Sequence, residues 1–101
     1  MYRIVSKRRL NTAMTWLVIE APMVAKKAKP GQFVILRTDE FGERIPLTMA
    51  GHDAEKGTID IIYAAVGRTT MLMDQLEEGD FMMDVVGPLG NLRNEGLKRL
   101  P

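Results

Sequence analysis

Short apolar runs, separated by turn residues about every ten positions, predict a chain of consecutive β-strands. Several of these runs alternate apolar and polar residues, which is typical of strands with one buried face. The expected strands are Tyr2–Leu10, Thr12–Glu20, Gln32–Thr38, Arg44–Met49, Thr58–Val66 and Asp80–Val86. Six short strands without alternating helices indicate an all-β fold, a six-stranded antiparallel barrel of Greek-key type.

The hydrophobic period changes once along the chain. Apolar residues recur at helical spacing in Thr69–Glu78, where Thr69 or Thr70 could cap the start and Gly79 follows the end. We therefore expect one short helix between the last two strands. The lysine-bearing segment Ala21–Pro30 is expected to be an irregular connection, since it ends in a proline-glycine turn signal.

The composition excludes several classes of protein. The chain has 101 residues, no cysteine and a single histidine, His52. Disulfides, cysteine-ligated metals and thiol nucleophiles are therefore excluded, and a histidine-based metal site or catalytic triad is not expected. No run approaches the roughly 18–20 apolar residues of a membrane helix, and no signal-peptide pattern opens the chain. A cytoplasmic protein without a membrane contact is expected.

The net charge of +1 hides an uneven distribution. Residues 1–30 contain seven basic residues and one acidic residue, whereas residues 31–101 contain seven basic and twelve acidic ones. A basic first third could bind nucleic acid or a protein partner, or it could simply be the solvated faces of two strands and a loop. No aromatic residues interleave with these charges as a base-stacking surface requires, so nucleic acid is the less favoured partner.

One turn carries residues that could bind a phosphate. Val66–Thr70 connects an apolar strand to the expected helix and contains Gly67, Arg68 and two threonine hydroxyls. A glycine allows a ligand to approach the backbone closely, and the first amides of a helix attract anions. An ordinary strand-to-helix turn with a threonine cap has the same residues, so this turn alone leaves both interpretations open.

A second candidate segment precedes the same strand. Arg44–Thr48 offers a basic side chain, a hydroxyl, and Pro46, which cannot donate to the hydrogen-bond ladder. Arg44 and Thr48 share one face because strand side chains alternate, although a solvent-facing arginine on an edge strand has the same pattern. A barrel would bring both segments to one rim with Tyr63 between them. Such a groove would suit an aromatic ring system that carries a diphosphate.

Four segments occur in a characteristic order: Pro30–Val34, Arg44–Thr48, Ile61–Thr70 and Gly87–Asn91. Together they resemble the FAD-binding barrel of the ferredoxin–NADP reductase superfamily, over nearly the whole chain. The resemblance is greatest to small electron-transfer subunits, namely those of NADH-dependent ferredoxin:NADP oxidoreductase (also called sulfide dehydrogenase) and, less closely, of dihydroorotate dehydrogenase. Each motif is weak alone, and the set is specific.

The resemblance implies that the chain binds FAD. In the family, the arginine of the element matching Arg44–Thr48 pairs with the pyrophosphate, and its hydroxyl residue lies near flavin N5. Gly67 and the two threonines after it would hold the pyrophosphate, and Gly87–Asn91 would lie beside the flavin. The implied cofactor-binding residues are Arg44, Pro46, Leu47, Thr48, Ile62, Tyr63, Ala64, Gly67, Thr69 and Thr70. No catalytic side chain is expected, because FAD itself carries out the hydride and electron chemistry.

Two residues depart from the family pattern. Arg44 precedes Thr48 by four positions instead of three, so Ile45 occupies the position of the family's arginine. Either the strand bulges at Pro46, or Arg44 reaches the phosphate from a neighbouring position. Leu47 replaces the tyrosine of many members, which removes an aromatic contact with the flavin.

The family continues into an NAD(P)-binding α/β domain, and its small subunits add a cysteine cluster that holds a [2Fe–2S] centre. Nothing in this chain corresponds to either, so residues 1–91 are expected to form the FAD-binding barrel and residues 92–101 a tail or the start of a linker. In the intact protein, NAD(P)H would reduce FAD, and electrons would pass to a larger iron–sulfur partner subunit. The separate barrel is expected to oxidise NAD(P)H poorly.

Two other interpretations remain open. The chain could be a non-enzymatic β-barrel that binds a protein partner or nucleic acid through its basic first third. Alternatively, it could lack flavin and form a homodimer that covers the groove, because exposed apolar surface of that size is commonly covered by a partner.

Overall fold

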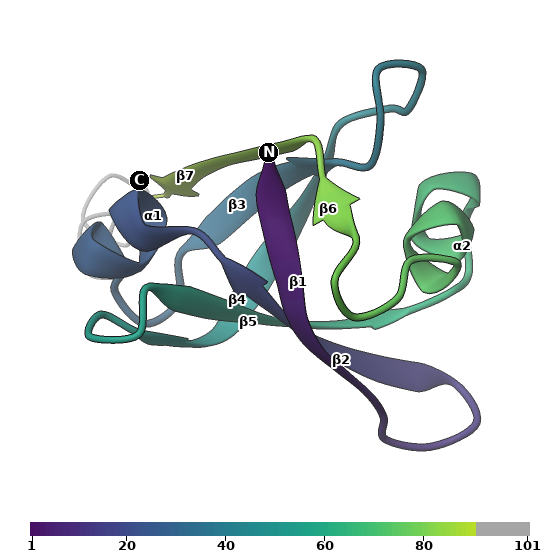
Figure 1. Ribbon diagram of the computed structural model, residues 1–101, viewed down its shortest axis with the longest axis horizontal. Helices are drawn as coiled ribbons and strands as arrows, with labels where there is room; N and C mark the ends of the chain where they lie inside the picture. Colours follow the sequence, from purple (N-terminus) through teal and green to yellow (C-terminus); the bar gives the residue numbers. More distant parts are fainter. Residues whose placement is uncertain (91–101) are drawn as a thin grey trace, which may run out of the picture.

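Seven strands form one antiparallel sheet in the computed structural model, which describes residues 1–90 (Figure 1). The predicted tail, residues 92–101, and Asn91 lie outside the described residues. The strands are β1 (Tyr2–Arg9), β2 (Met14–Glu20), β3 (Phe33–Arg37), β4 (Ile45–Asp53), β5 (Thr58–Ala64), β6 (Phe81–Met82) and β7 (Asp84–Leu89). The two helices are α1 (Pro22–Lys27) and α2 (Arg68–Asp74).

The sheet has the strand order β6-β1-β2-β5-β4-β3-β7. β2 pairs with β5 along its whole length, so the chain leaves the sheet after β2 and returns beside it later. The two edge strands, β6 and β7, are consecutive in the sequence with only Met83 between them. The sheet must therefore curl into a half-barrel. The predicted all-β antiparallel class is confirmed, and the predicted number of strands is wrong by one.

The additional strand arises because the last expected strand changes partner in its middle. β6 pairs with β1, whereas β7 pairs with β3 on the other side of the half-barrel. At the change, the Met83 amide donates to the carbonyl of Arg37 at 3.0 Å. This residue breaks the alternation, so Met82 and Val85 are buried and Phe81 is exposed. The prediction of a single strand over Asp80–Val86 is therefore wrong.

The core lies on the concave face of the sheet, where β-branched and other aliphatic side chains alternate inward. The largest fully buried side chains are Ile4, Leu17, Ile19, Val34, Leu36, Ile59, Ile61, Met73 and Met82. β5 contributes every second residue to this core because a strand directs successive side chains to opposite faces. Consequently, the residues between them, such as Ile62, remain on the outer surface.

Helix α1 lies in the segment expected to be an irregular connection. Its proline stands in the first turn, Lys26 and Lys27 occupy the last turn, and Val24 and Ala25 are buried. These features favour a helix, because proline fits the first turn and cations stabilise the carbonyl end. Six residues are too few to show a helical hydrophobic period. Neither α1 nor α2, the helices within residues 1–90, is long and apolar enough to cross a membrane.

Helix α2 confirms the predicted helix between the last strands, with different ends. Gly67, rather than Thr69 or Thr70, is the N-cap, and the helix ends at Asp74. Thr70 still contributes to the cap, because its hydroxyl accepts a hydrogen bond from the Gly67 amide at 3.0 Å. In Figure 1, α2 lies at the end of the half-barrel opposite α1.

Candidate functional site

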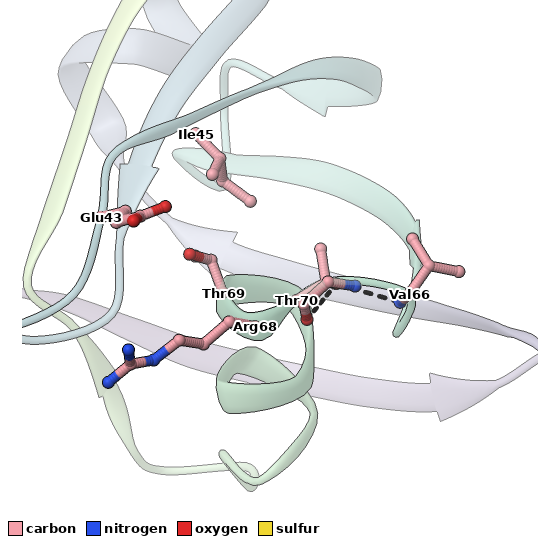
Figure 2. Close-up of a pocket in the computed structure, with 7 residues that line it drawn as sticks. Glu43, Ile45, Val66, Arg68, Thr69 and Thr70 are labelled. Atoms are coloured by element: carbon pink, nitrogen blue, oxygen red, sulfur yellow. Dashed lines mark hydrogen bonds between the residues drawn. The ribbon is translucent and has the colours of Figure 1, made fainter.

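A cavity of about 230 Å³ opens where the turn between β5 and α2 faces the start of β4 (Figure 2). Its lining comes from two segments that flank β5 in the sequence. The lining residues are Glu43, Ile45, Val66, Gly67, Arg68, Thr69 and Thr70. The cavity is smaller than the roughly 300–1,000 Å³ of pockets that enclose a whole small molecule. It can therefore enclose one polar group of a larger ligand.

Hydrogen bonds of the Thr70 hydroxyl hold the turn closed. This oxygen accepts from the amides of Val66, at 3.1 Å, and Gly67, at 3.0 Å, and it donates to the Gly67 carbonyl at 3.0 Å. Figure 2 shows this turn at one side of the cavity. The amides of residues 68–70, in the first turn of α2, have no acceptor within the described range, as at the start of any helix. The turn therefore presents free amide donors beside the Thr69 hydroxyl, while the Thr70 hydroxyl is engaged within the turn.

The cavity contains one cationic and one anionic side chain. Arg68 extends from the first turn of α2, and its guanidinium forms no ion pair with any residue between 1 and 90. Glu43 also lines the cavity, on the same side as the Arg68 guanidinium and away from Val66 in Figure 2, so an anionic ligand would meet one attractive and one repulsive charge. The net electrostatic effect depends on which side chain lies closer to the bound group.

Arg44, the predicted pyrophosphate ligand, lies away from this cavity. Its Nη2 is 3.5 Å from Oδ2 of Asp84, and the same oxygen accepts from Nε of Arg37 at 2.8 Å. Because neighbouring residues of an extended segment point in opposite directions, Glu43 and Ile45 face the cavity while Arg44 does not. Of the two arginines in the candidate segments, Arg68 is the one at the cavity.

The outer face of β4 carries two of the predicted residues. Pro46 and Thr48 are exposed, whereas Leu47, between them, packs against the core. The ladder between β3 and β4 runs through Pro46 without a register shift, so the bulge considered there is absent. The irregularity of β4 lies between Met49 and Gly51, where it pairs with β5.

β5 places its three predicted residues on both faces of the sheet. Ile62 is 37% exposed on the outer face, and Ala64 is half-buried on the same face. Tyr63 points inward and is only 3% exposed. The prediction that Tyr63 lies in the groove is therefore wrong for its ring, because the strand's alternation directs this side chain into the core.

The hydroxyl of Tyr63 donates to Oδ1 of Asp74 at 3.0 Å. Burial raises the pKa of Tyr63, and the neighbouring Asp74 carboxylate raises it further. The same carboxylate accepts from the Arg9 guanidinium, which lowers the pKa of Asp74, as does the bond from Tyr63. Both groups therefore keep a fixed protonation state near neutral pH, with Tyr63 neutral and Asp74 ionised.

Four lining residues were absent from the implied cofactor-binding set: Glu43, Ile45, Val66 and Arg68. Alternation alone could have found Ile45, since Leu47 and Met49 are apolar and two residues apart, and Ile45 continues their face. The position of Glu43 follows from Ile45 in the same way. Within residues 1–90, no group of three histidine, cysteine, aspartate or glutamate residues could hold a metal ion.

Comparisons of the sequence reveal several relatives, although no family model matches the chain. An uncharacterized protein in the adh 3' region of Clostridium beijerinckii is 54% identical over 90 residues, which is 89% of this chain and 30% of that protein. A dihydroorotate dehydrogenase B (NAD(+)), electron transfer subunit homolog of Thermotoga maritima is 51% identical over 73 residues, 72% of this chain and 26% of that protein. The chain thus spans about a third or less of these relatives.

Comparisons of the structure agree with those of the sequence. One similar chain comes from a study of flavin-based electron bifurcation by the NADH-dependent reduced ferredoxin-NADP oxidoreductase. It superposes with a TM-score of 0.87 at 44% identity, over 90% of this chain and 34% of that one. The cytochrome b5 reductase domain of Ulva prolifera nitrate reductase has a TM-score of 0.67 at 18% identity, over 88% and 40% of the two chains. The second similarity indicates a shared fold alone.

Proposed function

Because this chain belongs to the ferredoxin–NADP reductase superfamily, we propose that residues 1–91 form the FAD-binding barrel of an electron-transferring oxidoreductase subunit. In this proposal, NAD(P)H bound by another domain reduces FAD, and electrons pass to a larger iron–sulfur partner subunit. Residues 92–101 would begin the connection to that domain. The cofactor supplies the hydride and electron transfer, and the protein binds it, orients it and adjusts its potential.

The observation that carries this proposal is the donor set of the cavity. A pyrophosphate needs cations and hydrogen-bond donors, and the cavity offers Arg68, free amides of the first turn of α2, and the Thr69 hydroxyl, while the Thr70 hydroxyl holds the turn. Its volume of about 230 Å³ suits a phosphate group and its neighbours better than a whole dinucleotide. The residues present therefore fit the polar middle of FAD, with Gly67 keeping the turn free of a side chain.

The ring system would have to lie outside this cavity, on the outer face of β4 and β5. That face exposes Pro46, Thr48 and Ile62, with Ala64 beside them. Thr48 would supply the hydroxyl near the reactive end of the flavin, and the backbone of residues 62–64 would contact the ribityl chain. Tyr63 and Leu47 would contribute only through their backbones, because both side chains face the core.

The alternative of a basic binding surface loses support from the ion pairs. Lys7 lies 3.8 Å from Glu77, and Arg9 lies 3.0 Å from Asp74. Two cations of the basic first third thus meet carboxylates of the acidic remainder, which lowers the positive potential that nucleic acid requires. Homodimerisation over the outer face remains a proposal for protein purified without flavin.

We predict that the purified chain binds FAD more tightly than FMN. FAD brings two linked phosphates to the cavity, whereas FMN brings one, and each charge-assisted hydrogen bond contributes about 1.5–3 kcal/mol. A difference in Kd of at least tenfold is expected, measured by quenching of flavin fluorescence and by the visible absorption spectrum.

The control for this titration is riboflavin, which has the ring but no phosphate and should bind most weakly. Equal Kd values for FAD and FMN would remove the pyrophosphate assignment while leaving a flavin site. Absence of binding by all three flavins would contradict the proposed function itself.

A matched pair of variants tests which arginine meets the phosphates. Arg68→Gln should weaken FAD binding about tenfold or more, because it removes the guanidinium at the cavity. Arg44→Gln should weaken it less than threefold, since Arg44 is directed toward Asp84. FAD titrations of both variants at one salt concentration decide between the two arginines. A larger loss of affinity in Arg44→Gln than in Arg68→Gln would assign the phosphate to Arg44, as the family's arginine implies.

A further inference from the structure

A cluster of polar side chains surrounds the carboxylate of Asp74, at the end of α2 farther from the cavity. Nη2 of Arg9 donates to Oδ2 at 3.0 Å and to Oδ1 at 3.2 Å. The Tyr63 hydroxyl donates to Oδ1 at 3.0 Å, and the Thr15 hydroxyl lies 3.4 Å from the same oxygen. Three strands, β1, β2 and β5, thus each contribute one donor to a single carboxylate.

A fourth contact comes from Lys7 of β1. Its Nζ donates to the carbonyl of Asp74 at 2.6 Å and to that of Leu76 at 2.8 Å, and its side chain is only 13% exposed. The last carbonyls of a helix have no intrahelical partner, and a cation placed there is favourable. Lys7 therefore fixes the carboxyl end of α2 to the sheet.

Apolar packing holds α2 only weakly. Thr69 and Met73 are the only buried residues of this seven-residue helix, and Met71 is 57% exposed. A helix this short is not stable alone in water, so contacts with the sheet must maintain it. The polar cluster supplies most of the side-chain hydrogen bonds between α2 and the sheet.

The hydrogen bond between Tyr63 and Asp74 joins the two ends of the segment that contains the turn and α2. It joins two residues that are 11 positions apart and that bracket the whole phosphate-binding segment, the turn Val66–Thr70 and helix α2. One hydrogen bond thus closes this segment into a loop at its base. Any movement of α2 along the sheet would have to break it.

We propose that Tyr63, Asp74 and Lys7 are positioning residues that act through α2 and fix the Val66–Thr70 wall of the cavity. None of the three residues lines the cavity, so the effect of their side chains on a ligand is indirect. The effect on α2 is independent of any ligand, whereas the effect on FAD rests on the proposed function. Loss of one donor is expected to loosen the turn and weaken phosphate binding while leaving the ring contacts on β4 and β5 intact.

The test uses the full chain with Tyr63→Phe, which removes one hydroxyl and keeps the buried ring. Ile59→Val is the matched control, because Ile59 is fully buried on the same strand and the change costs a comparable amount of stability. Lys7→Met is a second variant that keeps an unbranched side chain without the charge. Hydrogen exchange of the Met71 amide, which bonds to the Gly67 carbonyl at 2.9 Å, reports on α2 directly.

Exchange of this amide should become about tenfold faster in Tyr63→Phe and Lys7→Met and stay within twofold in Ile59→Val, as expected for the loss of one hydrogen bond. The Kd for FAD should rise about fivefold to tenfold in the same two variants, while that for riboflavin changes less than twofold.

Two results would overturn the proposal. Exchange at Met71 that is equally fast in the control and in Tyr63→Phe would show only general destabilisation. If the affinities for FAD and riboflavin fall by equal factors, α2 does not transmit the change to the Val66–Thr70 turn. If the unaltered chain binds no flavin, the proposed function fails, and hydrogen exchange still decides whether the cluster fixes α2.

Discussion

Replacing Thr70 with glutamate is expected to abolish FAD retention, whereas replacing it with glutamine is expected to leave binding largely intact. Both side chains can accept the hydrogen bond from the Gly67 amide that Thr70 accepts at 3.0 Å, because glutamate and glutamine are the usual residues at this position of a capping box. The two variants therefore share the turn and differ by one negative charge at the cavity.

The size of the effect follows from the distance between like charges. A carboxylate about 4 Å from a phosphate costs about 4 kcal/mol at the effective dielectric constant of a protein surface. Since each 1.4 kcal/mol is a factor of ten, the Kd for FAD should be about 100-fold to 1,000-fold higher in Thr70→Glu than in Thr70→Gln. Glu43 already contributes one negative charge to the cavity, so a second would leave Arg68 outnumbered.

Equilibrium dialysis of FAD and circular dichroism of both variants would check this prediction. Riboflavin, which has no phosphate, should bind both variants equally. Equal FAD affinities in the two folded variants would exclude a phosphate beside Thr70 and would move the ligand to another face of the half-barrel.

Replacing Asp74 with asparagine is expected to lower the free energy of unfolding by about 2 kcal/mol at pH 7, a decrease of roughly 10 °C in Tm. The change weakens the contacts of the Arg9 Nη2 with both carboxylate oxygens and leaves the buried Tyr63 and Thr15 hydroxyls with a poorer acceptor. Asp39→Asn is the control, because Asp39 accepts one bond from the Phe41 amide in an exposed loop, which asparagine can also accept. Urea unfolding measures both variants.

The same variant should remove part of the acid sensitivity of the fold. Hydrogen bonds from Arg9 and Tyr63 lower the pKa of Asp74 below its usual value of 3.8. A carboxylate whose pKa is lower in the folded than in the unfolded state stabilises the fold at every pH above its unfolded-state pKa. This contribution disappears as the pH falls through the folded-state pKa. The difference in free energy of unfolding between the unaltered chain and Asp74→Asn should therefore be largest at pH 7 and shrink below about pH 4. A difference that is constant down to pH 2 would exclude an ionised Asp74 as its cause.

Local sequence patterns were sufficient to predict most of the strands and the helix after β5. Thr58–Ala64 is apolar and β-branched, and the segment after Gly67 changes to helical spacing, so both elements follow from neighbouring residues. The break at Met83 was not predictable in this way. It arises because β6 and β7 pair with β1 and β3, strands more than 45 residues earlier in the sequence. Helix α1 was missed because six residues contain too little periodic information.

The candidate site, like the fold, was predictable from the sequence only in part. The residue types of Val66–Thr70 were compatible with a phosphate-binding turn and with an ordinary capped turn, and the structure brings this turn to the start of β4. The direction of individual side chains was not determined by residue type. Ile62 and Tyr63 are both compatible with a buried face, and only the pairing of β5 with β2 and β4 directs Tyr63 inward and leaves Ile62 outside.

The sequence by itself therefore determined most of the strand segments, the presence of a helix after β5 and a candidate turn for an anion, because backbone preferences and hydrophobic spacing act between near neighbours. It also showed a basic first third and an acidic remainder. Only the tertiary structure decided that Lys7 and Arg9 meet α2 across more than 60 positions, that Arg44 is directed toward Asp84, and that Ile45 lines the cavity. Those outcomes depend on how distant strands pair when the sheet curls, which no local pattern encodes.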